Sequence, residues 1–165
     1  MFLNSRPMNH TTSENQAQDP HSFAQPDQAV VTHLHLDIQV YFDLERISGK
    51  ATYAIIATPE AGEIIFDTDG LRIKEVKLNA ATAGKFTIGE AKPYLGRPLI
   101  INLEPGTKKV TIWYETAKSA AALQWLAPAQ TSGKKYPFLF TQSQAILART
   151  WLPCQDSPGI RFTYE

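Results

Sequence analysis

Alternation of apolar and polar residues is the strongest pattern in the chain. The clearest run covers residues 30–42, in which the apolar positions are Leu34, Leu36, Ile38, Val40 and Phe42. Successive side chains of a β-strand point to opposite faces, so this run predicts a strand with one core face and one polar face. Residues 43–49 read as a turn, and residues 50–57 as the returning strand of a long hairpin.

Shorter runs of the same kind continue along the chain and predict an all-β fold. The further predicted strands cover residues 63–67, 71–79, 85–88, 99–103, 109–114, 138–148 and 160–164. Only residues 119–125 indicate a short helical turn. We therefore expect a saddle or sandwich of mostly antiparallel strands. The last run stops mid-pattern at Glu165, which indicates a sheet truncated at its C-terminal edge rather than a natural short terminal strand.

Within residues 71–79 the apolar positions change phase. Leu71 and Ile73 occupy odd positions, whereas Val76 and Leu78 occupy even ones. One extra residue would restore the register, so we expect a β-bulge near Lys74 and Glu75.

Residues 1–28 lack the alternating pattern. They are rich in Asn, Gln, Ser, Thr and Pro, a composition typical of a flexible arm. Within this arm we expect residues 21–28 to lie extended along the surface. The predicted domain organisation is thus a flexible N-terminal arm over residues 1–28 and a β domain over residues 29–165.

Composition and charge narrow the class of protein. The chain has 165 residues, 43% of them hydrophobic, and its 16 basic and 16 acidic residues cancel. Such balance gives no electrostatic basis for binding nucleic acid or an anionic membrane. No apolar run reaches the length of a signal peptide or a membrane span. A single cysteine allows no internal disulfide, so we expect a soluble cytoplasmic protein.

Signatures of self-contained enzymes do not occur in the sequence, which has no His-Glu-x-x-His, Gly-x-Ser-x-Gly or phosphate-binding Gly loop. His33 and His35 share a strand face, but two ligands do not make a zinc site, so we expect the polar face of a strand. Cys154 is expected to be a buried structural thiol rather than a nucleophile. For Trp125 and Trp151 we favour packing over a stacking platform for ligands.

Residues 138–158 place polar side chains within a strongly apolar stretch. Gln142 and Gln144 would share one face of the predicted strand. Taken alone, these residues favour two solvent-facing amides, although buried or ligand-binding amides also fit the pattern. Arg149 and Asp156 are expected to form an ion pair that braces the following loop.

The same stretch carries a family resemblance. Its most specific pieces are TQSQAI (residues 141–146) and LPCQDSP (residues 152–158), and the similarity extends to THLHLDIQVYFD (residues 32–43) and IIFDTDGLRIKEVKLN (residues 64–79). From about residue 31 to residue 165 the chain resembles the N-terminal domain of the zinc aminopeptidases of family M1 that are related to leukotriene A(4) hydrolase.

The resemblance implies an all-β saddle that packs against a separate catalytic domain of the same protein. In this family that domain carries the zinc ligands, so the zinc would bind outside this chain, and the chain alone would be inactive. The intact protein would remove N-terminal residues from peptides with a free N-terminus, and some members also hydrolyse a fatty-acid epoxide.

The family's Gln-x-Gln motif falls on Gln142 and Gln144. By resemblance, Gln144 helps to bind the substrate's α-amino group, and Gln142 lines the same pocket. Ser143 and Ala145 would offer backbone groups to the ligand. The chain departs from the family at Leu147, where relatives have a histidine, and at Ser143, where a cysteine is common, which favours peptide over epoxide chemistry.

A rival from another class is a stand-alone β-sandwich binding module with no catalytic role. The abrupt end of the pattern at Glu165 and the apolar residues 138–152 argue against it, because such a module needs a self-contained surface.

Overall fold

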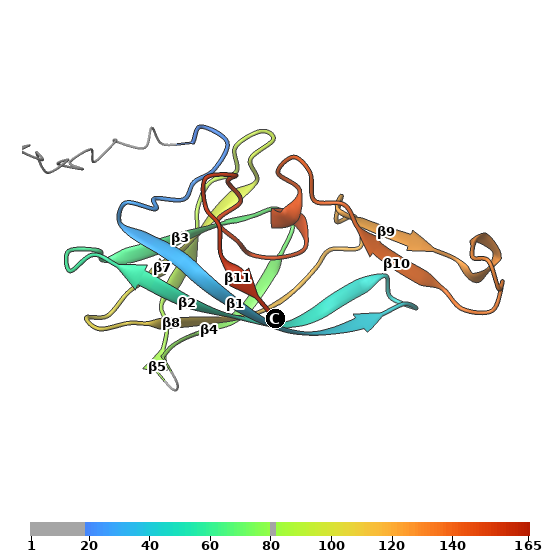
Figure 1. The fold of residues 1–165 in the computed structure, drawn as a ribbon, viewed down its shortest axis with the longest axis horizontal. Helices are drawn as coiled ribbons and strands as arrows, with labels where there is room; N and C mark the ends of the chain where they lie inside the picture. Colours follow the sequence, from blue (N-terminus) through green and yellow to red (C-terminus); the bar gives the residue numbers. More distant parts are fainter. Residues whose placement is uncertain (1–18, 80–81) are drawn as a thin grey trace, which may run out of the picture.

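Strands account for nearly all of the regular structure in the computed structural model, which describes residues 19–79 and 82–165 (Figure 1). The strands are β1 (Ala29–Tyr41), β2 (Arg46–Ala57), β3 (Glu63–Thr68), β4 (Arg72–Leu78), β5 (Thr82–Ala83), β6 (Phe86–Ile88), β7 (Arg97–Asn102), β8 (Lys109–Glu115), β9 (Leu123–Leu126), β10 (Phe138–Thr141) and β11 (Thr163–Tyr164). Two short 3-10 helices are η1 (Pro128–Gln130) and η2 (Ala148–Thr150). The predicted all-β class is confirmed.

Three sheets organise these strands. A six-stranded sheet has the order β11-β1-β2-β8-β4-β5, a three-stranded sheet the order β3-β7-β6, and β9 pairs with β10 alone. Among the described residues only the pair β1–β11 is parallel, which confirms the mostly antiparallel prediction. The predicted long hairpin is β1–β2, paired from Ala29 opposite Ala57 to Tyr41 opposite Arg46.

The predicted β-bulge is present in β4. Its pairing with β8 shifts register between Ile73 and Glu75, so Lys74 is the extra residue. A second shift lies in β1 between Val31 and His33. Val31 and Leu34 are both buried although they are three positions apart, and this change of phase is its signature in the sequence.

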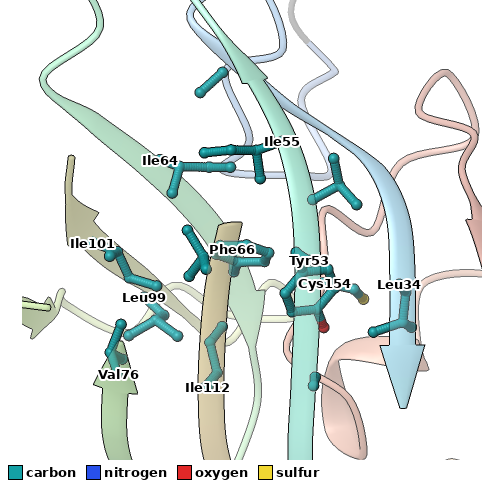
Figure 2. Packing of buried hydrophobic residues seen from close by; sticks show 14 of the residues in the cluster. Leu34, Tyr53, Ile55, Ile64, Phe66, Val76, Leu99, Ile101, Ile112 and Cys154 are labelled. Carbon is teal, nitrogen blue, oxygen red and sulfur yellow. The ribbon is translucent and has the colours of Figure 1, made fainter. Parts of the chain in front are cut away.

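The main hydrophobic core lies between the six-stranded and three-stranded sheets (Figure 2). The ring of Tyr53 from β2 packs on that of Phe66 from β3, with centroids 4.8 Å apart. Leu99 and Ile101 of β7 are fully buried in the same cluster. Each large apolar side chain that is buried completely contributes about 1.5–3 kcal/mol to the stability of this sandwich.

The β9–β10 hairpin projects from the rest of the fold (Figure 1). A smaller hydrophobic cluster joins it to the end of the β1–β2 hairpin that carries the turn. It contains Ile47, Ala120 and Leu123, with Trp125 and Trp151 packed against them. The prediction that both tryptophans serve packing is confirmed.

Two predicted elements near this hairpin were wrong. Residues 119–125 form turns that lead into β9 rather than a helical turn, because Leu123–Leu126 pairs with Phe138–Thr141. Pairing with a partner strand here outweighs the helix propensity of the alanines. The strand predicted over residues 138–148 ends at Thr141, since β9 offers no partner beyond Leu123. Gln142 and Gln144 therefore do not lie on a strand.

The predicted arm falls partly outside the described residues, which begin at Asp19. Within its described part, Ser22 and Ala24 are buried against the β domain. The final predicted strand is shorter than expected, because only Thr163 and Tyr164 pair with β1.

Candidate functional site

The two glutamines lie on a turn that follows β10 directly. We call residues 142–145 the glutamine turn. At its start the backbone N–H of Gln142 donates to the carbonyl of Ala122 over 2.9 Å. The side-chain Oε1 of Gln142 then accepts the backbone N–H of Gln144 over 3.1 Å. The Gln142 side chain therefore stabilises the turn through a hydrogen bond within it. The sequence did not predict this contact.

The Gln144 side chain is exposed and forms no hydrogen bond with any other residue that the structure describes. Gln142 and Ala145 are also exposed, whereas Ser143 is half-buried. An unpaired carboxamide offers a carbonyl acceptor and an NH₂ donor to a ligand. The structure therefore brings Gln142, Ser143, Gln144 and Ala145 together on one surface turn.

Two hydroxyl groups form hydrogen bonds in and next to this turn. The indole Nε1 of Trp151 donates to Ser143 Oγ over 3.1 Å. Thr150 Oγ1 donates to the carbonyl of Leu147 over 2.8 Å and accepts the backbone N–H of Ala122 over 3.1 Å. Thr150 belongs to η2, so its hydroxyl connects this short helix and Leu147, the residue before it, to Ala122, directly before β9.

Arg149 of η2 is the most unusual buried residue, with a side chain that is only 1% exposed. Its Nε lies 3.1 Å from Asp156 Oδ2, so the structure brings the predicted ion pair together. The guanidinium also donates to the carbonyls of Leu95 and His21 over 2.9 and 2.8 Å. A single side chain therefore connects η2 to the arm and to the loop before β7.

Sequence reasoning missed Asp67 at the end of β3. Its carboxylate is fully buried and accepts hydrogen bonds from Ser22 Oγ (2.6 Å), the Phe23 N–H (2.7 Å) and the Asp156 N–H (2.8 Å). Arg149 Nη1 lies 3.8 Å from its Oδ1. A carboxylate at the end of an otherwise apolar run was the signal that could have revealed it, because buried carboxylates require partners.

The residues next to this network are structural. Cys154 is 3% exposed, which confirms the prediction of a buried thiol, and burial raises its pKa well above the ordinary value. Gln155, a polar residue of the apolar stretch 138–158, is 2% exposed. Its Oε1 accepts the Val31 N–H and its Nε2 donates to the Ala29 carbonyl, each over 2.9 Å, so it clamps the start of β1.

His33 and His35 lie on the polar face of β1, opposite β11. His33 Nδ1 is 2.8 Å from Thr163 Oγ1, and His35 Nδ1 is 3.2 Å from Glu165 Oε1. Residues 19–79 and 82–165 contain no group of three or more His, Cys, Asp or Glu arranged to hold a metal ion. Nor does any helix in this part of the chain have the length and hydrophobicity needed to cross a membrane.

Comparisons with known proteins agree with this architecture. Leucine aminopeptidase 2 of Aspergillus fumigatus is 37% identical over 162 residues, which are 94% of this chain and 26% of that protein. Leukotriene A-4 hydrolase of Xenopus laevis is 36% identical over 152 residues, covering 88% of this chain and 25% of its own length. The chain thus spans about a quarter of the length of these relatives.

Solved structures show the same fold. Native leukotriene A4 hydrolase from Saccharomyces cerevisiae superposes with a TM-score of 0.84 at 31% identity, over 93% of this chain and 25% of that one. An M1 zinc metallopeptidase from Deinococcus radiodurans shares the fold at 18% identity, with a TM-score of 0.59 over 83% of this chain and 31% of that one. Residues 30–165 match the Peptidase M1 N-terminal domain family, so the chain belongs to peptidase family M1 and forms its N-terminal domain.

Proposed function

We propose that this domain forms one wall of the substrate cleft of a zinc aminopeptidase, and that Gln144 binds the free α-amino group of a peptide. The observation that carries this proposal is the exposed Gln144 carboxamide, which has no hydrogen-bond partner among residues 19–79 and 82–165. It stands on a turn that the Trp151 indole holds through Ser143. Ser143 and Ala145 would add backbone contacts, and Gln142 would line the pocket beside them.

The chemistry of a carboxamide suits this task. An aminopeptidase must select a peptide with a protonated α-amino group. It must reject peptides whose N-terminus is blocked, and it must not cleave internal peptide bonds. A glutamine carbonyl accepts a hydrogen bond from an ammonium group. It adds no negative charge beside the carboxylates that the catalytic domain would contribute to binding the same amine. Its fixed place sets how far the substrate enters, which is an orientation effect.

The zinc and the proton-transfer groups would come from a catalytic domain of the same protein. The relative from Deinococcus radiodurans is a zinc metallopeptidase, and one of its structures contains a bound Tyr-Ser-Ala substrate. Phe138 and Phe140 expose their rings beside the glutamine turn, a surface suited to an apolar partner domain. The lone buried thiol of Cys154 fits a reducing compartment, so we place the protein in the cytoplasm.

Substitution Gln144→Leu in the full-length protein tests the anchor. A hydrogen bond to a charged group contributes about 1.5–3 kcal/mol, so KM for peptides should rise about tenfold or more while zinc content stays the same. Gln28→Leu is the matched control, because Gln28 is likewise an exposed amide without a side-chain hydrogen bond in the described residues. An unchanged KM in the Gln144 variant would refute the anchor.

The division of labour has its own test. The isolated chain should bind no stoichiometric zinc and should hydrolyse no aminoacyl-anilide. Hydrolysis by the purified chain would contradict the assignment of the catalytic groups to another domain.

A further inference from the structure

We propose that Trp151 is a positioning residue that holds the glutamine turn in place through Ser143. Its effect on catalysis rests on the proposed role of Gln144, whereas its effect on the turn does not. The hydrogen bond from Trp151 Nε1 to Ser143 Oγ, 3.1 Å long, is the contact that carries the proposal.

Ser143 stands between the two glutamines and is the one half-buried member of the glutamine turn. Its hydroxyl therefore faces the domain while the neighbouring side chains face solvent. Gln142 Oε1 bonds to the Gln144 N–H, so this contact lies within the turn and does not link it to the core. The Ser143 hydroxyl supplies that link.

The position of the Trp151 indole is itself determined by packing. Trp151 packs against both hydrophobic clusters, the main core and the smaller one under the β9–β10 hairpin. The residues before it, Arg149 and Thr150, are 1% and 3% exposed. A ring held between two packed clusters presents its N–H in one direction, so the core determines where the Ser143 hydroxyl can lie.

Other anchors of the turn leave this link a distinct task. The backbone bond from Gln142 to Ala122 fixes the start of the turn, and the Leu147 N–H donates to the Ser143 carbonyl over 2.9 Å. Both bonds can persist while the turn pivots about them. Loss of the indole–hydroxyl bond should release that pivot and move Gln144 relative to a bound amine.

The chain offers a matched control for the tryptophan. Trp125 packs in the smaller cluster as Trp151 does, but its Nε1 is buried without a hydrogen-bond partner among the described residues. Trp125→Phe therefore removes a similar indole ring without removing a link to the turn. Comparing the two variants separates the hydrogen bond from packing alone.

The first measurement is the rate of amide hydrogen exchange at the Gln144 N–H in the isolated chain, monitored by NMR. A typical hydrogen bond contributes about 0.5–1.5 kcal/mol, so exchange should accelerate about two- to tenfold in Ser143→Ala and Trp151→Phe. Ser143→Thr keeps the hydroxyl, so the Gln144 amide should exchange as slowly as in the unsubstituted chain. Trp125→Phe should leave this amide unchanged, and Ser143→Ala should add nothing in the Trp151→Phe background.

The second measurement is steady-state kinetics of the full-length protein on peptides with a free N-terminus. Ser143→Ala and Trp151→Phe should raise KM about two- to tenfold and change kcat by less than about twofold. The positioning role is overturned if Gln144 exchange is unchanged in Ser143→Ala, or if Trp125→Phe accelerates it equally. If exchange changes as expected while Gln144→Leu leaves KM unaltered, the positioning role stands and the proposed amine anchor fails.

Discussion

At the scale of single residues, Arg149 connects several segments of the chain next to the candidate site. Its buried guanidinium bonds to Asp156 within its own segment, to His21 in the arm and to Leu95 before β7. A buried charge is tolerated only when its partners replace water, and here two carboxylates and backbone carbonyls do so. Four hydrogen bonds from one side chain thereby join segments that are far apart in the sequence.

We expect Arg149→Leu to destabilise the isolated chain severely. The substitution leaves the buried carboxylate of Asp67 and the half-buried carboxylate of Asp156 without their cation, and breaking a buried pair costs about 3–5 kcal/mol. Urea unfolding of the chain measures the loss. Arg161→Leu is the control, since Arg161 is exposed and should change stability by no more than about 0.5 kcal/mol. Equal stability of both variants would show that the buried ion pair contributes little.

At the scale of elements, the β1–β2 hairpin depends on close backbone approach at one glycine. Gly49 lies opposite Ile38, and a Cβ at Gly49 would come within 2.7 Å of the Ile38 Cα and would also meet the Asp37 carbonyl. Real Cβ atoms do not come this close to a backbone atom, so the two long strands would have to separate locally.

Gly49→Ala should therefore weaken the hairpin. Overpacking of this kind costs about 1–3 kcal/mol, and the midpoint of urea unfolding should fall accordingly. Gly62→Ala serves as the control, because a Cβ at Gly62 would meet nothing within 4 Å. A Gly49 variant as stable as the Gly62 variant would mean that the strands accommodate the methyl group.

At the scale of the whole molecule, the β9–β10 hairpin presents two different faces. One face packs Trp125 and Leu139 on the smaller cluster. The other exposes Phe138 and Phe140, at 54% and 44%, with ring centroids 6.4 Å apart. The glutamine turn follows this face directly along the chain, so the proposed anchor and the apolar surface lie at the same end of the domain (Figure 1).

The isolated chain should self-associate through this apolar face. Sedimentation velocity should show association that increases with concentration, and Phe138→Ser combined with Phe140→Ser should reduce it, because exposed aromatic patches drive association. Ile56→Ser, which changes an exposed isoleucine on β2, should have little effect. Association that persists unchanged in the double variant would place the contact elsewhere.

Local patterns in the sequence were enough to predict most of the main sheets. Alternation with a period of two requires only neighbouring residues, and it located most of the strands and the bulge at Lys74. The ion pair of Arg149 and Asp156 was also accessible, since seven positions separate the two residues. Family resemblance supplied the glutamines as candidates, without their conformation.

Tertiary structure alone decided where strands stop and which distant groups meet. β10 ends at Thr141 because β9 offers no further partner, and this places Gln142 and Gln144 on a turn instead of a strand face. Asp67 meets Ser22 across 45 positions and Asp156 across 89, separations that no local pattern encodes. Strand ends and buried polar contacts are satisfied by partners that only the folded chain brings together, and for that reason the sequence by itself did not determine them.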